Sequence, residues 1–449
     1  MLPILPCSRV FDQQTMTHLL AHDPLVQRYR TLFATFDWSV VPETALAPAQ
    51  PGKRPHPQTA YLKALLLKLQ EGLTYCTRLR RFLIEHPLLV LELGFRPVLN
   101  YDLPYGFDVE RTVPSARWFR FQQQHLSHTL LQTLLMRTVE LLREEIPGFA
   151  EVVSFDVTHI YAWVRQNNPR VYVQGPFNVS HRCKGDPDCR LGVKKSSNQV
   201  QPDGSTKEKK ESLFGYGSGI ATCTDPVYGD IILAEYTQPF NEGDITYFFP
   251  LYVQTVATLG FFPTHLAADA AFDAWYCYQG TATRHGIAAI PLNSHGHPDT
   301  QRDTDAVPLC AMGLRMIPTF QFSHTNGFRA QRFRCPLLFP QQTDFTCKQP
   351  QFLKEKGCVK DVNWEAGGKM RVMLDRDHPL FKAVYRQRTS TERGNSHSKA
   401  LGLERPKVRN IHSVRHLTTL TYILINLQAL QRAKTRNASL LGTLLAQVV

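Results

Sequence analysis

The sequence predicts an α/β protein in which a mixed sheet flanked by helices follows an all-helical N-terminal domain. Three stretches predict this architecture. Residues 55–147 carry apolar side chains at helical spacing, residues 148–293 contain strand-like runs that come to alternate with helices, and residues from 379 onward return to helical spacing. At 449 residues the chain has room for two or three domains of about 150 residues each.

Residues 1–54 are interpreted as an N-terminal segment and linker, because residues 42–57 read PETALAPAQPGKRPHP. Residues 55–147 are predicted to be helical and basic, with a second helical run over residues 115–145. One face of the first helix collects leucines, and arginines follow in the next turns: Leu62, Leu65, Leu66 and Leu69, then Arg78, Arg80 and Arg81. This composition suits DNA contact, and a plain helical scaffold is the alternative.

Residues 148–293 form the first part of the predicted sheet. The runs EVVSFDVTHIYAWV, FGYGSGIAT and VYGDIILAEYTQ are typical of strands, and THLAAD and GIAAIPLN are predicted as two more. Helices are predicted over residues 244–259 and 272–285. The polar, basic stretch over residues 180–211 is predicted to be a long solvated loop.

Residues 294–378 lose this rhythm and are interpreted as an insertion that ends in a strand-like run, VNWEAGGKMRVML. Residues 379–449 are predicted to be helical and to complete the sheet domain. One apolar stripe there favours core packing over a partner site: Ile411, Val414, Leu417, Leu420, Ile423, Leu424, Leu427 and Leu430.

The charge balance points to an anionic partner. Lys and Arg number 51 against 38 Asp and Glu, which gives a net charge of +13 and favours nucleic acid, with a solubility charge as the alternative. The N-terminus lacks the basic and apolar regions of a signal peptide, and residues 417–430 are too short and too polar to span a bilayer. We therefore expect a soluble, intracellular protein without membrane contact.

Three acids stand out by position. Asp156 lies inside a strongly apolar strand, Asp269 ends the strand THLAAD, and Glu392 lies in the helical segment YRQRTSTERGNSHSK. A carboxylate in an apolar strand is unfavourable unless it is exposed, paired or bound to metal, and strand ends in α/β sheets commonly build ligand sites. Each acid alone has a structural interpretation too. Together, on a basic protein, they suit phosphodiester cleavage with Mg²⁺, or Mn²⁺, held by carboxylates.

The segment around Glu392 has its own spacing. Tyr385, Arg388, Glu392 and Lys399 are 3, 4 and 7 residues apart, so on a single helix they would share one stripe about 60° wide. This stripe is either a solvated ion-pair face or a metal-binding acid flanked by phosphate-binding cations. Gly394 within it either admits a DNA backbone or breaks the helix.

These residues resemble the insertion-sequence DDE transposases. YRQRTSTERGNSHSK matches the Y-x2-R-x3-E-x6-K signature of that family at Tyr385, Arg388, Glu392 and Lys399. LAADAAFD resembles the second-aspartate motif and SFDVTHI the first-aspartate strand, although Ala271 stands where glycine is frequent and Asp273 is a second acid nearby. The separations are 113 residues (269 − 156) and 123 residues (392 − 269), and the wide second gap suits members with an insertion.

The resemblance covers residues 150–435 and more weakly the helical region before them. It implies a ribonuclease H-like core in which Asp156, Asp269 and Glu392 hold Mg²⁺ and catalyse cleavage at element ends. Joining of the 3′-OH ends to target DNA would follow, with Tyr385, Arg388 and Lys399 contacting phosphates. It further implies a prokaryotic, cytoplasmic, nucleoid-associated protein that acts as a homodimer. A ribonuclease H-like nuclease without strand transfer and a catalytically silent DNA-binding derivative are the alternatives.

Cysteines and histidines give weaker signals. Cys335, Cys347 and Cys358 follow one another at intervals of 12 and 11 positions, with Cys310 as a candidate fourth. Zinc sites usually show close cysteine pairs, which this set lacks, so the sequence favours reduced thiols over structural zinc. Cys183 and Cys189, with His181, are a looser alternative. Five histidines, none assigned to catalysis, more often pack or lie at the surface: His159, His265, His295, His297 and His397.

Overall fold

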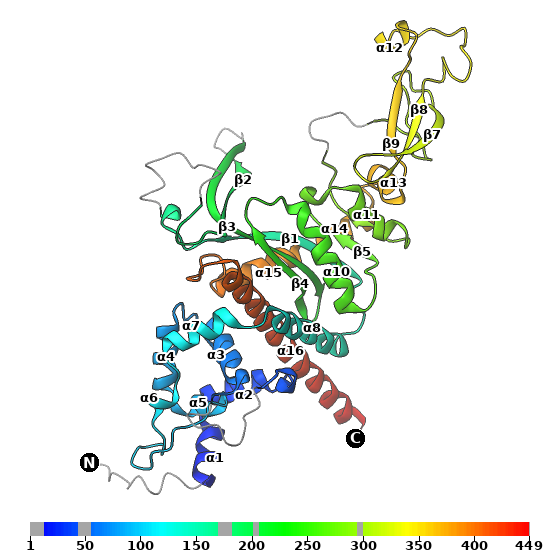
Figure 1. The fold of residues 1–449 in the computed structure, drawn as a ribbon. Coiled ribbons are helices and arrows are strands. Elements are labelled where there is room, and N and C mark those ends of the chain that lie inside the picture. The colour runs from blue at the N-terminus through cyan, green and yellow to red at the C-terminus, as the bar shows by residue number, and fades with distance from the viewer. Residues whose placement is uncertain (1–12, 44–54, 169–181, 201–205, 294–299, 449) are drawn as a thin grey trace.

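The computed structural model describes residues 13–43, 55–168, 182–200, 206–293 and 300–448, and it has the predicted mixture of helices and sheet (Figure 1). Helices fill the N-terminal third, a mixed sheet follows, and a smaller sheet extends from it. A long C-terminal helix runs between the N-terminal helices and the main sheet. The α/β class expected from the sequence is therefore confirmed. His181, His295, His297 and most of the linker over residues 42–57 lie outside the described residues.

The N-terminal helices begin earlier than the sequence suggested. Residues 1–54 were interpreted as a segment and linker, yet two helices lie there, and the second contributes Val26, Tyr29 and Phe33 to the core. The predicted helix over residues 115–145 is two helices, because the chain turns at Ser127, whose hydroxyl oxygen accepts the Leu130 backbone N–H at 3.3 Å. The helices are α1 (Gln13–His22), α2 (Pro24–Phe33), α3 (Gln58–Gln70), α4 (Cys76–Glu85), α5 (Pro87–Glu92), α6 (Val109–Thr112), α7 (Ala116–His125) and α8 (His128–Glu145).

The main sheet contains three antiparallel neighbours and a parallel set. Its spatial order is β2-β3-β1-β5-β6, with β4 also paired to β3; β1, β5 and β6 run parallel, whereas β3 is antiparallel to β1, β2 and β4. The strands are β1 (Val152–Tyr161), β2 (Arg190–Val200), β3 (Thr206–Asp225), β4 (Gly229–Pro239), β5 (His265–Ala267) and β6 (Ala288–Ala289). Helices α10 (Phe248–Leu259) and α11 (Trp275–Ala282) follow β4 and β5, where helices were predicted.

The solvated loop predicted over residues 180–211 is wrong for most of its length. Strand β2 and the first half of β3 pair there as an antiparallel ribbon that extends from the sheet. Polar composition concealed these strands, because the backbone hydrogen bonds of a ladder do not depend on apolar side chains. The root of the ribbon contributes Leu191 and Phe214 to the core.

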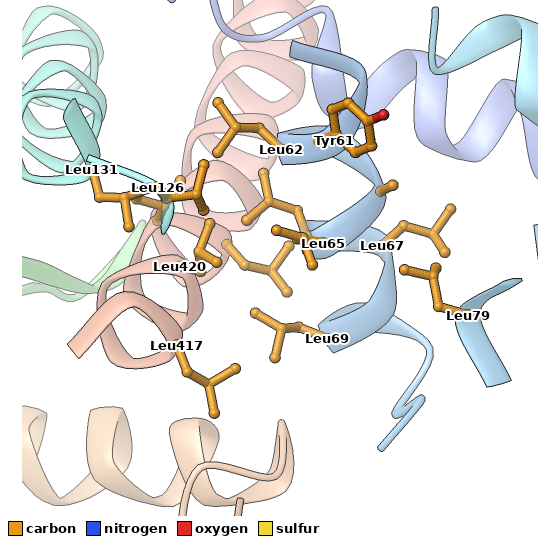
Figure 2. Close-up of a cluster of buried hydrophobic side chains, with 14 of the residues drawn as sticks. Tyr61, Leu62, Leu65, Leu67, Leu69, Leu79, Leu126, Leu131, Leu417 and Leu420 are labelled. Carbon is orange, nitrogen blue, oxygen red and sulfur yellow. The ribbon is translucent and has the colours of Figure 1, made fainter. Parts of the chain in front are cut away.

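Helix α16 (Ile411–Val448) joins the two halves of the molecule. Its predicted apolar stripe is buried as core, with side chains such as Leu420, Leu424 and Leu427 at most 1% exposed. Figure 2 shows Leu417 and Leu420 of this helix facing Leu62, Leu65 and Leu69 of α3. Among the helices of the described residues, none is long and apolar enough to cross a membrane.

The insertion carries a sheet of its own, with spatial order β7-β8-β9, as Figure 1 shows in yellow. The run VNWEAGGKMRVML was expected to be strand-like, but only its first residues are a strand. After Asn363, whose side-chain oxygen accepts the Glu365 N–H at 2.9 Å, the chain turns into helix α13 and packs against α11. The elements are β7 (Ile317–Ser323), β8 (Arg329–Arg334), α12 (Pro350–Leu353), β9 (Val359–Asn363) and α13 (Ala366–Met373).

Candidate active site

Asp156 and Asp269 lie at matching distances along two adjacent parallel chains. The β1–β5 pairing ends with Ser154 opposite Ala267, and each aspartate comes two residues later, Asp156 within β1 and Asp269 just after β5. Side chains alternate between the faces of a sheet, so these two carboxylates share the face of Ser154 and Ala267 as long as the strands stay extended. The separation of 113 residues read from the sequence is thus the register offset of the two strands.

The two carboxylates repel each other electrostatically. Burial raises the pKa of Asp156 to about 6, and the negative charge of Asp269 acts in the same direction, while the guanidinium of Arg388 partly opposes it. Asp269 begins the short helical turn that follows β5, where its Oδ1 accepts the Ala271 N–H at 3.0 Å. An unneutralised negative charge therefore accumulates at this end of the sheet.

A third aspartate, Asp244, belongs to the same group and was missed from the sequence. Burial raises its pKa to about 6, and Asp269 again raises it further. Asp244 opens the turn Asp244–Tyr247 that leads into α10, directly after β4. Its sequence context, NEGDITYFF, is polar and resembles an ordinary helix start, so only the fold brings it to the two strand ends.

Asp273, the acid that could be mistaken for Asp269, has a structural role. Its side chain is 1% exposed and forms a paired contact with the Arg371 guanidinium, at 2.9 and 2.7 Å. It also accepts the Tyr278 hydroxyl at 2.7 Å and the Asn293 N–H at 2.7 Å. With its acceptor capacity used in this way, Asp273 ties α11 to α13 and leaves Asp269 as the acid that faces Asp156.

Helix α15 (Thr389–Ala400) lies against β3, β1 and β4 and carries Glu392. Gly394 permits this approach, because a Cβ there would lie 3.1 Å from Ile232 Cδ1 and 3.5 Å from Ile220 Cδ1. Of the two roles foreseen for Gly394, neither holds as written: the helix continues through it, and its neighbour is the sheet. The next residue, Asn395, donates its Nδ2 to Asp156 Oδ2 at 3.0 Å.

The four residues of the Y-x2-R-x3-E-x6-K spacing do not share one helix. Tyr385 ends α14 (Pro379–Arg386), and Arg388 lies in the turn before α15. Because α14 packs over β5 and β6 while α15 packs over β3, the chain must change direction between them. Arg388 nevertheless reaches both neighbours, with its guanidinium 5.7 Å from the Tyr385 ring centre and 2.5 Å from Glu392 Oε1.

Lys399 lies at the other end of α15, apart from this cluster. Its Nζ is 3.7 Å from Glu404 Oε1, and both side chains are partly exposed. The structure thus brings Asp156, Asp269 and Arg388 into one electrostatic group, with Glu392 ion-paired to Arg388. The prediction that Tyr385, Arg388, Glu392 and Lys399 form one stripe on a single helix is therefore wrong.

The donor set suits a hard divalent cation, although it is not preassembled. Asp156 and Asp244 both have raised pKa values because of burial and of Asp269, and a cation would relieve that repulsion. Next to Asp156, the side-chain oxygen of buried Asn395 has no hydrogen-bond partner. Within the described ranges no three His, Cys, Asp or Glu side chains already converge as a metal cage. Glu392 would join only after leaving Arg388.

A basic, aromatic cavity of about 450 Å³ lies past the far end of β1. The Arg405 guanidinium lies 4.6 Å from the Tyr161 ring centre, and that of Arg409 lies 4.6 Å from the Trp163 ring centre. Lys407 and Arg165 also line the cavity, and its lining contains no acid. Cations held on aromatic faces, without acidic partners in the lining, form a surface suited to phosphate and bases. None of these residues was predicted from the sequence as part of a site.

Comparison with known proteins gives no independent assignment. No protein-family profile matches the chain, and no curated protein resembles it closely enough to count as a relative.

Proposed function

We propose that the protein is a DNA transposase of the DDE type, which cuts DNA at the ends of an insertion sequence and joins the 3′-OH ends to target DNA. The observation that carries this proposal is the juxtaposition of Asp156 in β1 and Asp269 just after β5, each two residues past the last pair of the β1–β5 ladder, with the helix bearing Glu392 packed over β1, β3 and β4. The signature spacing around Glu392 and the net charge of +13 support it.

The sheet order is compatible with a ribonuclease H-like core, which belongs to the same proposal. Three antiparallel strands, β4, β3 and β1, are followed by parallel β5 and β6, with helices α10 and α11 in the connections. The acids then come from a central strand, from its parallel neighbour and from a helix laid across the sheet. In this arrangement residues far apart in the chain supply one site, and the insertion stays outside it.

Asp156, Asp269 and Glu392 would hold Mg²⁺ or Mn²⁺, with Asp244 as a further acid beside them. When bound, the metal supplies Lewis-acid stabilisation of the attacking and leaving phosphate oxygens. The protein's own groups perform the remaining tasks. Asn395 orients the Asp156 carboxylate through its 3.0 Å hydrogen bond, and Arg388 offers a cation to a DNA phosphate.

DNA would extend from the acids toward the basic cavity. Tyr161 follows Asp156 by five residues, which in an extended strand is about 17 Å, or about five base pairs of duplex DNA at roughly 3.4 Å each. The odd separation turns the two side chains to opposite faces of the sheet, so the DNA would reach the cavity past the end of the strand. Tyr385, Arg388 and Lys399 would contact phosphates nearer the acids. Since two element ends must be joined in one reaction, we propose a homodimer as the working form.

Nicking of a supercoiled plasmid tests the proposal without knowledge of the element ends. We expect the wild type to nick in Mn²⁺ and the Asp156→Asn, Asp269→Asn and Glu392→Gln variants to lose nicking while they retain DNA in a mobility-shift assay. Asp377→Asn is the matched control, because that carboxylate is 96% exposed and lies outside the site. Nicking that persists in all three variants would overturn the assignment of these acids.

Strand joining separates a transposase from a nuclease. Labelled duplexes cut from the flanks of the coding region would be incubated with wild-type protein and a target plasmid. Labelled plasmid, absent with Asp156→Asn, is the result expected of a transposase. Nicking without joined product from any flank would favour the nuclease, and DNA binding without nicking would favour the silent derivative.

A further inference from the structure

The insertion places four cysteines at one end of its small sheet. The β8–β9 pairing ends with Arg334 opposite Val359, so Cys335 and Cys358 are the first residues beyond the last pair of the ladder, one on each adjacent chain. Gly357 brings the chains close, since a Cβ there would lie 2.7 Å from Cys335 Cβ and 3.5 Å from its sulfur.

Cys310 reaches the same place from a tight turn. Its N–H donates to Leu314 O at 2.8 Å, and the Gly313 N–H donates back to Cys310 O at 2.9 Å, with Gly313 at φ +74°. Cys358 packs against the buried cluster that contains Cys310, so this turn lies beside Cys358.

Cys347 completes the group. Cys335, Cys347 and Leu337 form one buried cluster, whereas Cys310 belongs to the neighbouring one, and Cys358 packs against both. Because Cys358 packs against both clusters, the four cysteines gather at one end of the small sheet, although 48 positions (358 − 310) separate the first from the last.

The segment between Cys335 and Cys358 has little secondary structure or buried core to stabilise it. Between Cys335 and Cys358 the only helix or strand is the four-residue α12, and Phe345 and Leu353 there are 74% and 72% exposed. A loop of this length with so small a core needs a cross-link or a metal to keep one conformation. Cys310, Cys335 and Cys347 are nevertheless 4–7% exposed.

We propose a structural zinc site at the end of the inserted sheet, with four thiolate ligands: Cys310, Cys335, Cys347 and Cys358. Zinc takes four cysteines in tetrahedral geometry at about 2.3 Å, and each thiol would release its proton to solvent on binding. In the described part of the chain no such cage is already closed, so the side chains must rotate inward around the ion. The usual close cysteine pair along the sequence is replaced here by Cys335 and Cys358, which lie on adjacent chains just beyond the end of the β8–β9 ladder.

Metal analysis of the full-length protein tests the proposal. After purification without chelator and dialysis against zinc-free buffer, we expect about one zinc ion per chain, lost in the Cys335→Ser and Cys358→Ser variants. Cys76→Ser, a buried cysteine of the helical region, is the matched control and should keep the ion, as should Cys183→Ser. An Asp156→Asn/Asp269→Asn variant should also keep it, which distinguishes this zinc from a metal at the acidic site.

A second readout does not depend on the folding of any variant. Wild-type protein reconstituted with Co²⁺ should show the sulfur-to-metal charge-transfer and ligand-field bands of a tetrahedral thiolate site. A wild type that remains metal-free after reconstitution and has all its thiols titratable would overturn the proposal. Loss of two thiols to a Cys335–Cys358 disulfide would overturn it as well.

Discussion

The acidic cluster should cost the metal-free protein stability, and replacing Asp156 with asparagine should remove that cost. Asp156 has a pKa of about 6 in the fold against an ordinary value of 3.8, mainly through burial and then through Asp269. A folded-state pKa about two above the ordinary value, at about 1.4 kcal/mol for each, corresponds to roughly 3 kcal/mol at pH 8. We expect Asp156→Asn to recover about 2–3 kcal/mol, because the amide oxygen can still accept the Asn395 hydrogen bond.

The pH dependence of this effect has a definite sign. Between about pH 4 and pH 6 the folded state holds a proton on Asp156 that the unfolded state has released, so the free energy of unfolding falls as pH rises. Above the folded-state pKa the loss is complete and constant. The stabilisation by Asp156→Asn should therefore be fully present at pH 8 and nearly absent at pH 4.

Urea unfolding in EDTA, followed by circular dichroism at pH 4.5, 6 and 8, measures the effect. Asp377→Asn serves as the exposed control and should leave the midpoint unchanged at every pH. Adding Mg²⁺ at pH 8 should stabilise the wild type and narrow its difference from Asp156→Asn, since the cation replaces the missing neutralisation. A variant that is less stable than wild type at pH 8, or equally stabilised at pH 4.5 and 8, would refute the electrostatic reasoning.

Three further predictions concern the surroundings of the site. Gly394→Val should lower stability by about 1–3 kcal/mol through overpacking against Ile232, measured by urea unfolding, with the exposed Ser396→Val as control. Arg409→Ala should weaken binding to generic duplex and reduce the magnitude of the salt slope by about one, while an unchanged slope would remove the cavity from the DNA path. Leu420→Ala should destabilise by about 2–5 kcal/mol in thermal unfolding, because the residue is 1% exposed between helical region and sheet; a loss below 1 kcal/mol would contradict that packing.

The periodicity of apolar residues correctly predicted those helices and strands that bury one face in a hydrophobic core. The apolar stripe of α16 and the aromatic, β-branched run of β1 are buried as their patterns indicate. Strand β2 was missed for the opposite reason, since a polar ribbon satisfies its backbone without a hydrophobic face. Helices α1 and α2 were missed because their short helical pattern was interpreted together with the linker at residues 42–57 that follows it.

For the candidate site, the sequence indicated some of the residues that meet but not how they meet, since Lys399 lies apart from the others. Asp156 and Asp269 could be paired in advance because one lies inside a recognisable apolar run and the other ends the next. Asp244 could not, since only the β4–β3–β1 pairing brings its turn to those strand ends. The one-helix stripe failed between Tyr385 and Arg388 because residue spacing takes no account of the two different surfaces on which α14 and α15 pack.

The two faces of helix α15 have different surroundings. Its inner face is fixed to the sheet by the close approach at Gly394, by Ser390 Oγ at 2.7 Å from Thr222 Oγ1, and by the paired contacts of Arg393 with Asp230 at 2.6 Å. These contacts are satisfied without any ligand. Its outer face presents Glu392, whose side chain is 53% exposed and held only by Arg388.

Arg388 therefore provides positive charge to more than one of the acids. It lowers the pKa of Asp156 while it neutralises Glu392, so one guanidinium compensates two carboxylates. A phosphate that drew Arg388 away would leave Glu392 unpaired and Asp156 less compensated, and both would then gain from a cation. Substrate and metal should accordingly bind with positive coupling at this site, because each relieves the charge that the other leaves behind.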